Sequence, residues 1–408
     1  MTRTFLAFGT EGTIFDRAAT PRAVRPAANL PPQRPLLTFE GVQATWPRAG
    51  REAAWLDLSV MTGEVLTLLG PAGAGKTTAL TVAAGFLHPD RGRVLLGDKE
   101  INRMLPHRRG FGWVPKPLAL FPGMTALENV AFPLEARGVG GSERRDRAVK
   151  ALATVGLAGQ EAARPEALDE AAALRVALAR ALVFAPPLLL LDDPLAALDA
   201  AARSDAIALI RRLTRAGTTS VLHATRDAAV AMAISDRIAV IQAGRIRQAG
   251  TPQALYDAPG DDAIAAQFGE VNRLHGRVLS VEDDLCRVAL DGGLEAVGAA
   301  ISALGRAPEP GGRCVLAIRP EHVAVAAMTA AELGEDAVPA QLLDAQFAGD
   351  HVRLRLRIEN GAELIARRPA GLPLPEPGGA AAVAWDAGAA RVYAGGAGEK
   401  EPPSGPAG

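Results

Sequence analysis

The chain has 408 residues, more than one hydrophobic core usually organises, so two or three domains are expected. Its 44 basic and 45 acidic residues nearly cancel, which argues against a nucleic-acid partner held by net charge. The two cysteines, Cys286 and Cys314, lack C-x-x-C spacing, which suits a reducing compartment and offers no metal site. No apolar run reaches the roughly 18 residues of a membrane span. We therefore expect a cytoplasmic protein of several domains.

Composition predicts where the ordered domains begin and end. Residues 1–35 are rich in Ala, Pro and Arg without periodicity, which predicts a disordered arm. Residues 394–408 are mostly Gly, Pro, Ala and charge, which predicts a disordered tail. Between them we expect a nucleotide-binding domain over 36–270 and a second domain over 271–393.

The most specific motif is a phosphate-binding loop, G-x-x-x-x-G-K-[ST], matched at every fixed position. It follows the apolar run Val65–Leu69, which reads as a buried strand, and precedes the helical pattern 79–84. Glycines allow backbone N–H groups to approach phosphate oxygens, and the helix N-terminus favours anions. Lys76 is expected to reach the β- and γ-phosphates, and Thr77 to ligate Mg²⁺. The residues of the predicted site are Gly70, Pro71, Ala72, Gly73, Ala74, Gly75, Lys76, Thr77 and Thr78.

A second acidic motif lies far downstream. Four leucines, 188–191, predict a strand buried on both faces, as in a parallel α/β sheet. Asp192 follows them, at the strand end where phosphate-loop enzymes place a Mg²⁺-ligating carboxylate. By difference (192 − 76), 116 positions separate this aspartate from Lys76, which leaves room for a helical insertion.

The region 271–393 shows short runs of alternating polarity. Examples are 286–290, 315–318 and 352–358, and Gly and Pro turns separate them. Such spacing predicts a small β-barrel or sandwich.

These motifs, in this order, resemble the ATP-binding subunits of ABC importers, in the subgroup that includes polyamine, iron(III), phosphonate and sugar systems. The resemblance covers about residues 36–390. It identifies residues 271–393 as similar to the transport-associated oligonucleotide-binding-fold domain of that subgroup. Further matching segments are 84–85, 119–122, 176–182, 192–199, 235–240, 244–246, 248–252 and 318–321.

The resemblance implies a fold and an assembly. The fold is α/β: a phosphate-loop ABC core with a helical insertion, followed by a small β-barrel-like domain. The implied assembly is a homodimer or a heterodimer with another ATP-binding subunit, with two ATP molecules between the subunits. It docks on two membrane permease subunits at the inner face of the cell membrane and serves a periplasmic solute-binding protein indirectly. Trp46 falls where the family stacks an aromatic ring on adenine, or it is an ordinary core or edge tryptophan.

Three catalytic positions depart from the family pattern. Lys116 replaces a glutamine that contacts Mg²⁺ or the attacking water, and an ammonium offers only donors. Asp193 replaces the catalytic glutamate with a side chain one methylene shorter, and displacements of roughly 1 Å can cost about 100-fold in rate. Arg226 replaces the switch histidine and cannot accept a hydrogen bond as neutral imidazole can.

The signature segment, Leu-Ser-Gly-Gly-Gln in the family, also departs from the pattern. Its serine and backbone N–H groups hold the γ-phosphate of the partner's ATP. Asp169 and Glu170 would instead place two negative charges near that phosphate, and Ala171 adds a methyl group where the family has glycine. Asp169 also suits the role of a helix cap. The aligned residues here are Leu168, Asp169, Glu170, Ala171 and Ala172.

Two hypotheses follow for hydrolysis. Loss at four separate motifs predicts reduced ATPase activity with nucleotide binding retained. Alternatively, Lys116 and Arg226 neutralise Asp169 and Glu170 across the subunit interface and rescue ordinary turnover. A non-hydrolysing nucleotide-binding regulatory subunit of a permease complex is the alternative function.

Two smaller features carry expectations of their own. Ser142 is predicted to cap a helix whose solvated face carries Arg144, Arg145 and Arg147. Phe121, Pro122 and Met124 fit either an apolar patch that docks a permease or a buried core.

Overall fold

The computed structural model describes residues 34–45, 52–215, 219–302, 307–327, 337–372 and 375–395. The predicted arm up to residue 33, Trp46 and the tail from residue 396 lie outside the described residues. The chain forms two compact units that divide between Asp257 and Ala258. Helix α9 (Asp262–Gln267) and Glu270 therefore belong with the second unit.

The first unit contains one ten-stranded sheet with the order β5-β4-β1-β2-β10-β9-β3-β8-β7-β6. Strands β3, β8, β7 and β6 run parallel at one end, and β1, β2 and β4 pair antiparallel at the other. The strand bounds are β1 Pro35–Thr45, β2 Glu52–Met61, β3 Val65–Leu69, β4 Arg91–Leu96, β5 Lys99–Glu100, β6 Gly112–Val114, β7 Leu188–Asp192, β8 Ser220–Thr225, β9 Arg237–Gln242 and β10 Arg245–Gly250.

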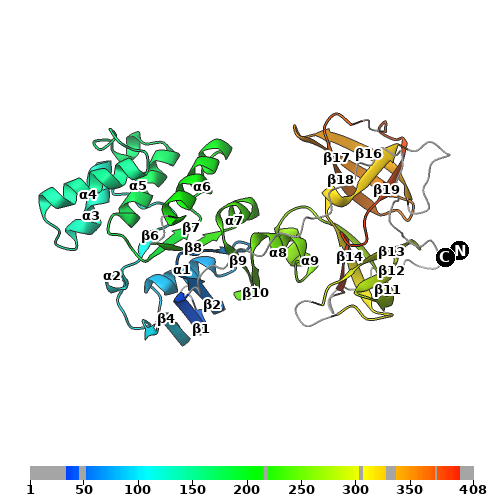
Figure 1. Ribbon diagram of the computed structural model, residues 1–408, viewed down its shortest axis with the longest axis horizontal. Helices are drawn as coiled ribbons and strands as arrows, with labels where there is room; N and C mark the ends of the chain where they lie inside the picture. Colours follow the sequence, from blue (N-terminus) through cyan, green and yellow to red (C-terminus); the bar gives the residue numbers. More distant parts are fainter. Residues whose placement is uncertain are drawn as a thin grey trace, which may run out of the picture. The chain divides into compact units, whose positions relative to one another are not determined.

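Helices cover both faces of the sheet (Figure 1). On β7, Leu188 and Leu190 pack with α1 and the antiparallel strands, whereas Leu189 and Leu191 pack with α5, α6 and the insertion helices. The four-leucine strand is thus buried on both faces, as its sequence predicted. The helical elements are α1 Lys76–Ala84, α2 Pro106–Arg109, α3 Ala126–Glu135, α4 Gly141–Thr154, η1 Pro165–Ala167, α5 Glu170–Leu182, α6 Ala200–Arg215, α7 Ala228–Ile234 and α8 Pro252–Asp257.

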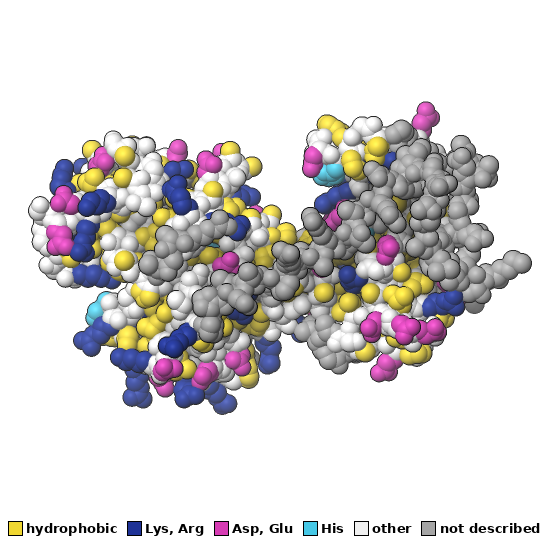
Figure 2. Space-filling model, viewed as in Figure 1, with side chains coloured by type: hydrophobic (Ala, Val, Ile, Leu, Met, Phe, Trp, Pro, Cys, Tyr) yellow, Lys and Arg dark blue, Asp and Glu magenta, His cyan; other side chains and the backbone are white. Residues whose placement is uncertain are grey.

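The insertion helices α3 to α5 carry a solvated charged face (Figure 2). Basic and acidic side chains alternate there, and Arg147 pairs with Glu143 one turn away on α4. The predicted solvated face is confirmed. The predicted cap at Ser142 is wrong, because α4 begins at Gly141 and its N-cap is Gly140, so Ser142 lies within the first turn.

The second unit combines a closed barrel, β11-β12-β13-β20-β14, with a five-stranded sheet, β15-β19-β16-β17-β18. One continuous hydrophobic cluster contains buried residues of both. The predicted strands 286–290, 315–318 and 352–358 lie within β12, β14 and β17, so the α/β core followed by a barrel-like domain is confirmed. The bounds are β11 Asn272–Glu282, β12 Leu285–Leu290, β13 Glu295–Ala300, β14 Arg313–Ile318, η3 Pro320–His322, β15 Ala324–Ala327, β16 Val338–Phe347, β17 His351–Ile358, β18 Glu363–Pro369, β19 Ala380–Ala384 and β20 Arg391–Ala394.

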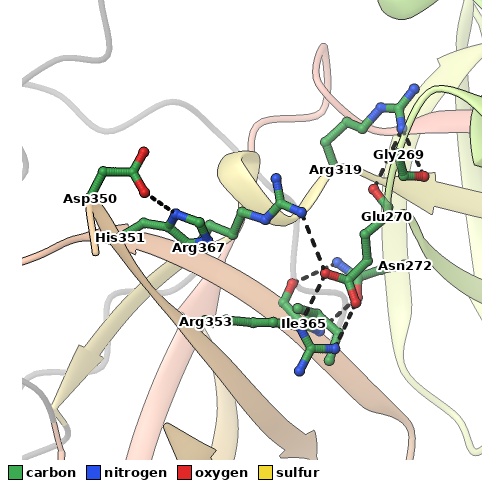
Figure 3. A network of polar contacts seen from close by, with 9 residues as sticks. All are labelled: Gly269, Glu270, Asn272, Arg319, Asp350, His351, Arg353, Ile365 and Arg367. Atoms are coloured by element: carbon green, nitrogen blue, oxygen red, sulfur yellow. Dashed lines mark hydrogen bonds and ion pairs between the residues drawn. The ribbon is translucent and has the colours of Figure 1, made fainter. Parts of the chain in front are cut away.

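A polar network joins the barrel to the sheet at the start of β11 (Figure 3). The buried Asn272 side chain donates to the Ile365 carbonyl at 2.8 Å and accepts from the Ile365 N–H at 2.7 Å. Next to it, Glu270 accepts two hydrogen bonds from Arg353 and lies 3.7 Å from Arg367. The Arg353 hydrogen bond is the main cause that lowers the pKa of Glu270. The amide of Asn272 thus satisfies the backbone carbonyl and N–H of Ile365 on β18, as the backbone of a neighbouring strand would.

Candidate nucleotide-binding site

The phosphate-binding loop lies where the sequence predicted it, between β3 and α1. All five residues of β3 are buried, and α1 begins at Lys76, with Gly75 at its N-cap in the left-handed region (φ 98°). At Gly70 a Cβ would lie 2.1 Å from the carbonyl oxygen of Ile241, so only glycine fits this close backbone approach. The loop is therefore held by backbone packing as well as by its own glycines.

Arg109, from α2, fixes the far end of the helix that the loop precedes. Its buried guanidinium donates to the carbonyls of Val82 and Ala83 at 2.8 and 2.7 Å, and to that of Ile101 at 2.7 Å. The last carbonyls of a helix have no partner within the helix, so an arginine satisfies them well. Burial lowers the pKa of Arg109 to about 10.

Lys76 folds back over the phosphate-binding loop. Its Nζ donates to the carbonyls of Gly70 and Pro71, each at 2.7 Å. Burial is the main cause that lowers the pKa of Lys76, and nearby charges act in both directions. The ammonium stays within reach of any anion seated on the loop.

The two expected magnesium ligands meet. Thr77 Oγ1 donates to Asp192 Oδ1 at 3.1 Å. Asp192 is buried at the end of β7, and desolvation is the main cause that raises its pKa. A hydroxyl and a carboxylate are hard oxygen ligands of the kind that Mg²⁺ prefers, so these residues fit that ion.

Two of the three substituted catalytic residues, Lys116 and Arg226, converge on the carboxylate of the third, Asp193. Lys116 Nζ lies 2.7 Å from Asp193 Oδ2, and Arg226 Nε lies 4.0 Å from the same oxygen. The other oxygen, Oδ1, accepts from Thr225 Oγ1 at 2.9 Å. Asp193 has a left-handed backbone (φ 47°), a conformation that Asp tolerates better than most residues. Both oxygens of Asp193 are thus engaged by neighbours in its own chain.

A cavity of about 340 Å³ opens beside this carboxylate. Asp193, Thr225 and Arg226 line it together with Arg203 and Asp227, which pair at 3.2 Å. Asp193 and Arg226 are therefore accessible from this cavity.

The degenerate signature segment forms the start of α5. Asp169 is the N-cap, and its Oδ1 accepts from the Ala172 N–H at 2.7 Å, which confirms the predicted cap. Glu170 is the first residue of the helix. A helix N-terminus whose donor is already bonded to a carboxylate is a poorer anion site than one with free N–H groups.

An apolar pocket on the first unit was missed by sequence reasoning. It has a volume of about 480 Å³ and is lined by Phe86, Phe111 and Trp113 with neighbouring residues of α1 and α2. Phe86 is exposed and meets Trp113 edge to face, with 5.6 Å between ring centroids. Aromatic residues are only 4% of the chain, so the F-G-W triplet at 111–113 was the available signal. Of the predicted patch, Phe121 and Pro122 are also exposed, so that segment is not core.

Comparison with known proteins agrees with this architecture. A family model described as ABC transporter matches residues 54–196, and one described as TOBE domain matches residues 316–392. The Fe(3+) ions import ATP-binding protein FbpC of Rhizobium etli is 39% identical over 313 residues, which cover 76% of this chain and 84% of the relative. The spermidine/putrescine import ATP-binding protein PotA of Rubrobacter xylanophilus is 36% identical over 334 residues, 81% and 87% of the two chains.

A third relative, the spermidine/putrescine import ATP-binding protein PotA of Pseudomonas aeruginosa, is 37% identical over 335 residues, which cover 81% of this chain and 91% of the relative. Among solved structures, a dimeric post-hydrolysis state of the ATP-binding cassette MJ0796 bound to ADP and Pi is 30% identical. It covers 53% of this chain and 98% of that one, with a TM-score of 0.49.

The fold and the loop define an ABC-type nucleotide-binding protein with a C-terminal TOBE domain. The chain belongs to the family of ATP-binding subunits of ABC importers. Within the part of the chain that the structure describes, no helix is both long and apolar enough to cross a membrane.

Proposed function

We propose that this chain binds ATP and Mg²⁺ and serves an ABC importer with impaired hydrolysis. Residues 70–78 hold the triphosphate, Lys76 contacts its β- and γ-phosphates, and Thr77 with Asp192 ligates Mg²⁺. The subunit acts at the inner face of the cell membrane, docked on two permease subunits, as a homodimer or with another ATP-binding subunit. A periplasmic solute-binding protein delivers the solute to that complex.

The observation that carries the impaired hydrolysis is the 2.7 Å contact between Lys116 Nζ and Asp193 Oδ2. A general base must direct a lone pair at the attacking water. Here an ammonium and a guanidinium face one oxygen of Asp193, and Thr225 occupies the other. A carboxylate held in this way neither orients water nor accepts its proton readily. The capped α5 supports the proposal, because it weakens the site that this chain would offer to a partner's ATP.

The apolar pocket around Phe86 supports docking to a permease. Its lining is aromatic and partly exposed, and such patches commonly mark protein contacts. We place the permease contact there and at the exposed Phe121.

Nucleotide binding is tested by titration with ATP and Mg²⁺. We expect Lys76→Ala to weaken ATP binding by at least about 100-fold, since it removes a charge-assisted contact to the phosphates worth roughly 3 kcal/mol. Lys150→Ala, which removes an exposed lysine from α4, is the matched control and should bind like the wild type. Unchanged affinity in Lys76→Ala would overturn the assignment of the site.

A further inference from the structure

The charge balance around Lys76 is unusual for a site that holds a metal–nucleotide complex. Burial is the main cause that lowers the pKa of Lys76, and four neighbouring charges also act on it, those of Asp193, Arg226, Asp192 and Lys116. All five groups therefore share one electrostatic environment. Three are cations and two are anions, so their formal charges give +1. With the neutral glutamine and histidine to which Lys116 and Arg226 correspond, the same set would carry −1.

The two extra cations can reach an anion. The side chains of Lys116 and Arg226 are 47% and 58% exposed, whereas Asp193 between them is only 13% exposed. Both side chains therefore reach solvent, and Arg226 also lines the cavity beside Asp193. An ammonium has three N–H donors and a guanidinium five, so each can bond a phosphate oxygen while it keeps its contact with Asp193.

A divalent cation at a triphosphate site neutralises phosphate charge and bridges its oxygens. Side-chain cations can also neutralise phosphate charge, without a metal. In the sheet order β3-β8-β7-β6, Arg226 follows β8 and Lys116 follows β6, so they flank Asp193, which follows β7. Lys76 follows β3, at the end of the phosphate-binding loop. These strands are parallel, so the three cations lie at the same edge of the sheet as the phosphate-binding loop.

We infer that Lys116 and Arg226 let this site bind free ATP, without a divalent cation, nearly as tightly as it binds Mg²⁺–ATP. The inference rests on the proposed nucleotide site at residues 70–78. It assigns the two substituted residues a positive role, as triphosphate ligands that take over charge neutralisation.

The test compares ATP affinity in buffer with Mg²⁺ and in buffer with EDTA, by calorimetric titration of the full chain. The variants are Lys116→Gln, Arg226→Gln and the double variant. Arg147→Gln on α4, where Arg147 pairs with Glu143, is the control for removal of one exposed positive charge. Thermal unfolding of each variant shows whether it is folded.

For the wild type and the control, EDTA should weaken ATP binding by no more than about threefold. For the double variant it should weaken binding by at least about 30-fold, since both charge-assisted hydrogen bonds to the triphosphate are lost. Each single variant should fall between these limits.

The effect of EDTA on the wild type, compared with its effect on the double variant, can overturn the inference. If EDTA reduces wild-type affinity as steeply as it reduces that of the double variant, Lys116 and Arg226 do not replace the metal. In that case Mg²⁺–ATP still binds and the proposed function stands. If the folded wild type binds ATP in neither buffer, the proposed nucleotide site itself is wrong.

Discussion

Around Asp193, each substituted position follows the end of a different strand. Lys116 comes after β6, Asp193 after β7 and Arg226 after β8, and these three strands are parallel neighbours in the sheet. Sequence alone identified each departure from the family pattern. It could not show that the lysine and the arginine face the aspartate, because that contact depends on the strand order and on side-chain direction.

At the same scale, the sequence correctly predicted features that depend on residues close together in the chain. The phosphate-binding loop and the Asp169 cap each follow from a residue and its immediate neighbours. Thr77 and Asp192 were each predicted from a motif, but their contact joins residues far apart in the chain. The alternative hypothesis, compensation by Lys116 and Arg226 across a subunit interface, was a longer-range inference. Within one chain, both residues already face Asp193.

His223 on β8 gives a pH-dependent prediction. It is fully buried, with Nδ1 3.1 Å from Thr67 Oγ1, and burial lowers its pKa to about 4. Between the ordinary pKa of about 6.5 and this value, the unfolded chain binds a proton that the folded chain does not. The free energy of unfolding should therefore fall as pH drops from about 6.5 to 4, by up to roughly 3 kcal/mol from this residue.

The measurement is urea unfolding at pH 7 and pH 5 for the wild type and for His223→Gln. We expect the variant to lose less stability between these pH values than the wild type does. His88→Gln, at an exposed histidine, should keep the wild-type pH dependence. An equal loss of stability in wild type and His223→Gln would show that His223 is not the buried neutral group described.

At the scale of elements, the periodicity of apolar residues predicted most of the fold. On β17, Val352, Leu354 and Leu356 alternate with arginines and pack into the core, as the sequence pattern predicts. Connections that depend on one polar side chain were not visible in the sequence. Asn272 pairs with Ile365, whose position in the chain is remote, and nothing in either local pattern indicates the partner.

That connection can be tested by Asn272→Ala. Removal of the amide leaves the N–H and the carbonyl of Ile365 without the partners they have in this half-buried position, so we expect the second unit to lose about 2–4 kcal/mol of unfolding free energy. Denaturant unfolding followed in the second unit measures the loss. Gln346→Ala, at an exposed residue of β16, is the control and should change stability by less than about 0.5 kcal/mol. If Asn272→Ala lost as little stability as the control, the result would contradict the role of Asn272 in joining β11 to β18.

At the scale of the whole molecule, the chain has two units with separate cores. The clusters around β3 and β7 and the cluster of the barrel contain no common residues. Composition placed the domain boundary after residue 270, whereas the structure divides the chain after Asp257. The difference arises because α9 contacts the second unit: Arg273 donates to the Asp262 carbonyl and lies 3.4 Å from its carboxylate. A helix of only six residues is too short for its sequence pattern to indicate which core it joins.

We therefore expect a fragment that ends at Asp257 to fold and to bind ATP within about threefold of the full chain. Its core and its phosphate-binding loop are both contained in residues 34–257. Circular dichroism and ATP titration measure the two properties. An insoluble fragment, or a folded one that does not bind nucleotide, would show that the second unit completes the first. We propose that the second unit contributes to dimerisation instead.

The central claim is that ATP binds and turns over slowly because Asp193 is engaged and the signature segment is degenerate. Steady-state phosphate release tests it most directly, on the wild type and on a repaired variant with Lys116→Gln, Asp193→Glu, Arg226→His, Asp169→Ser, Glu170→Gly and Ala171→Gly. We expect wild-type turnover below about 0.1 per second and at least about a tenfold gain in the full repair, with smaller gains in partial repairs because such residues act as one unit. Wild-type turnover of about 1–10 per second, within the usual range for enzymes, would contradict the account.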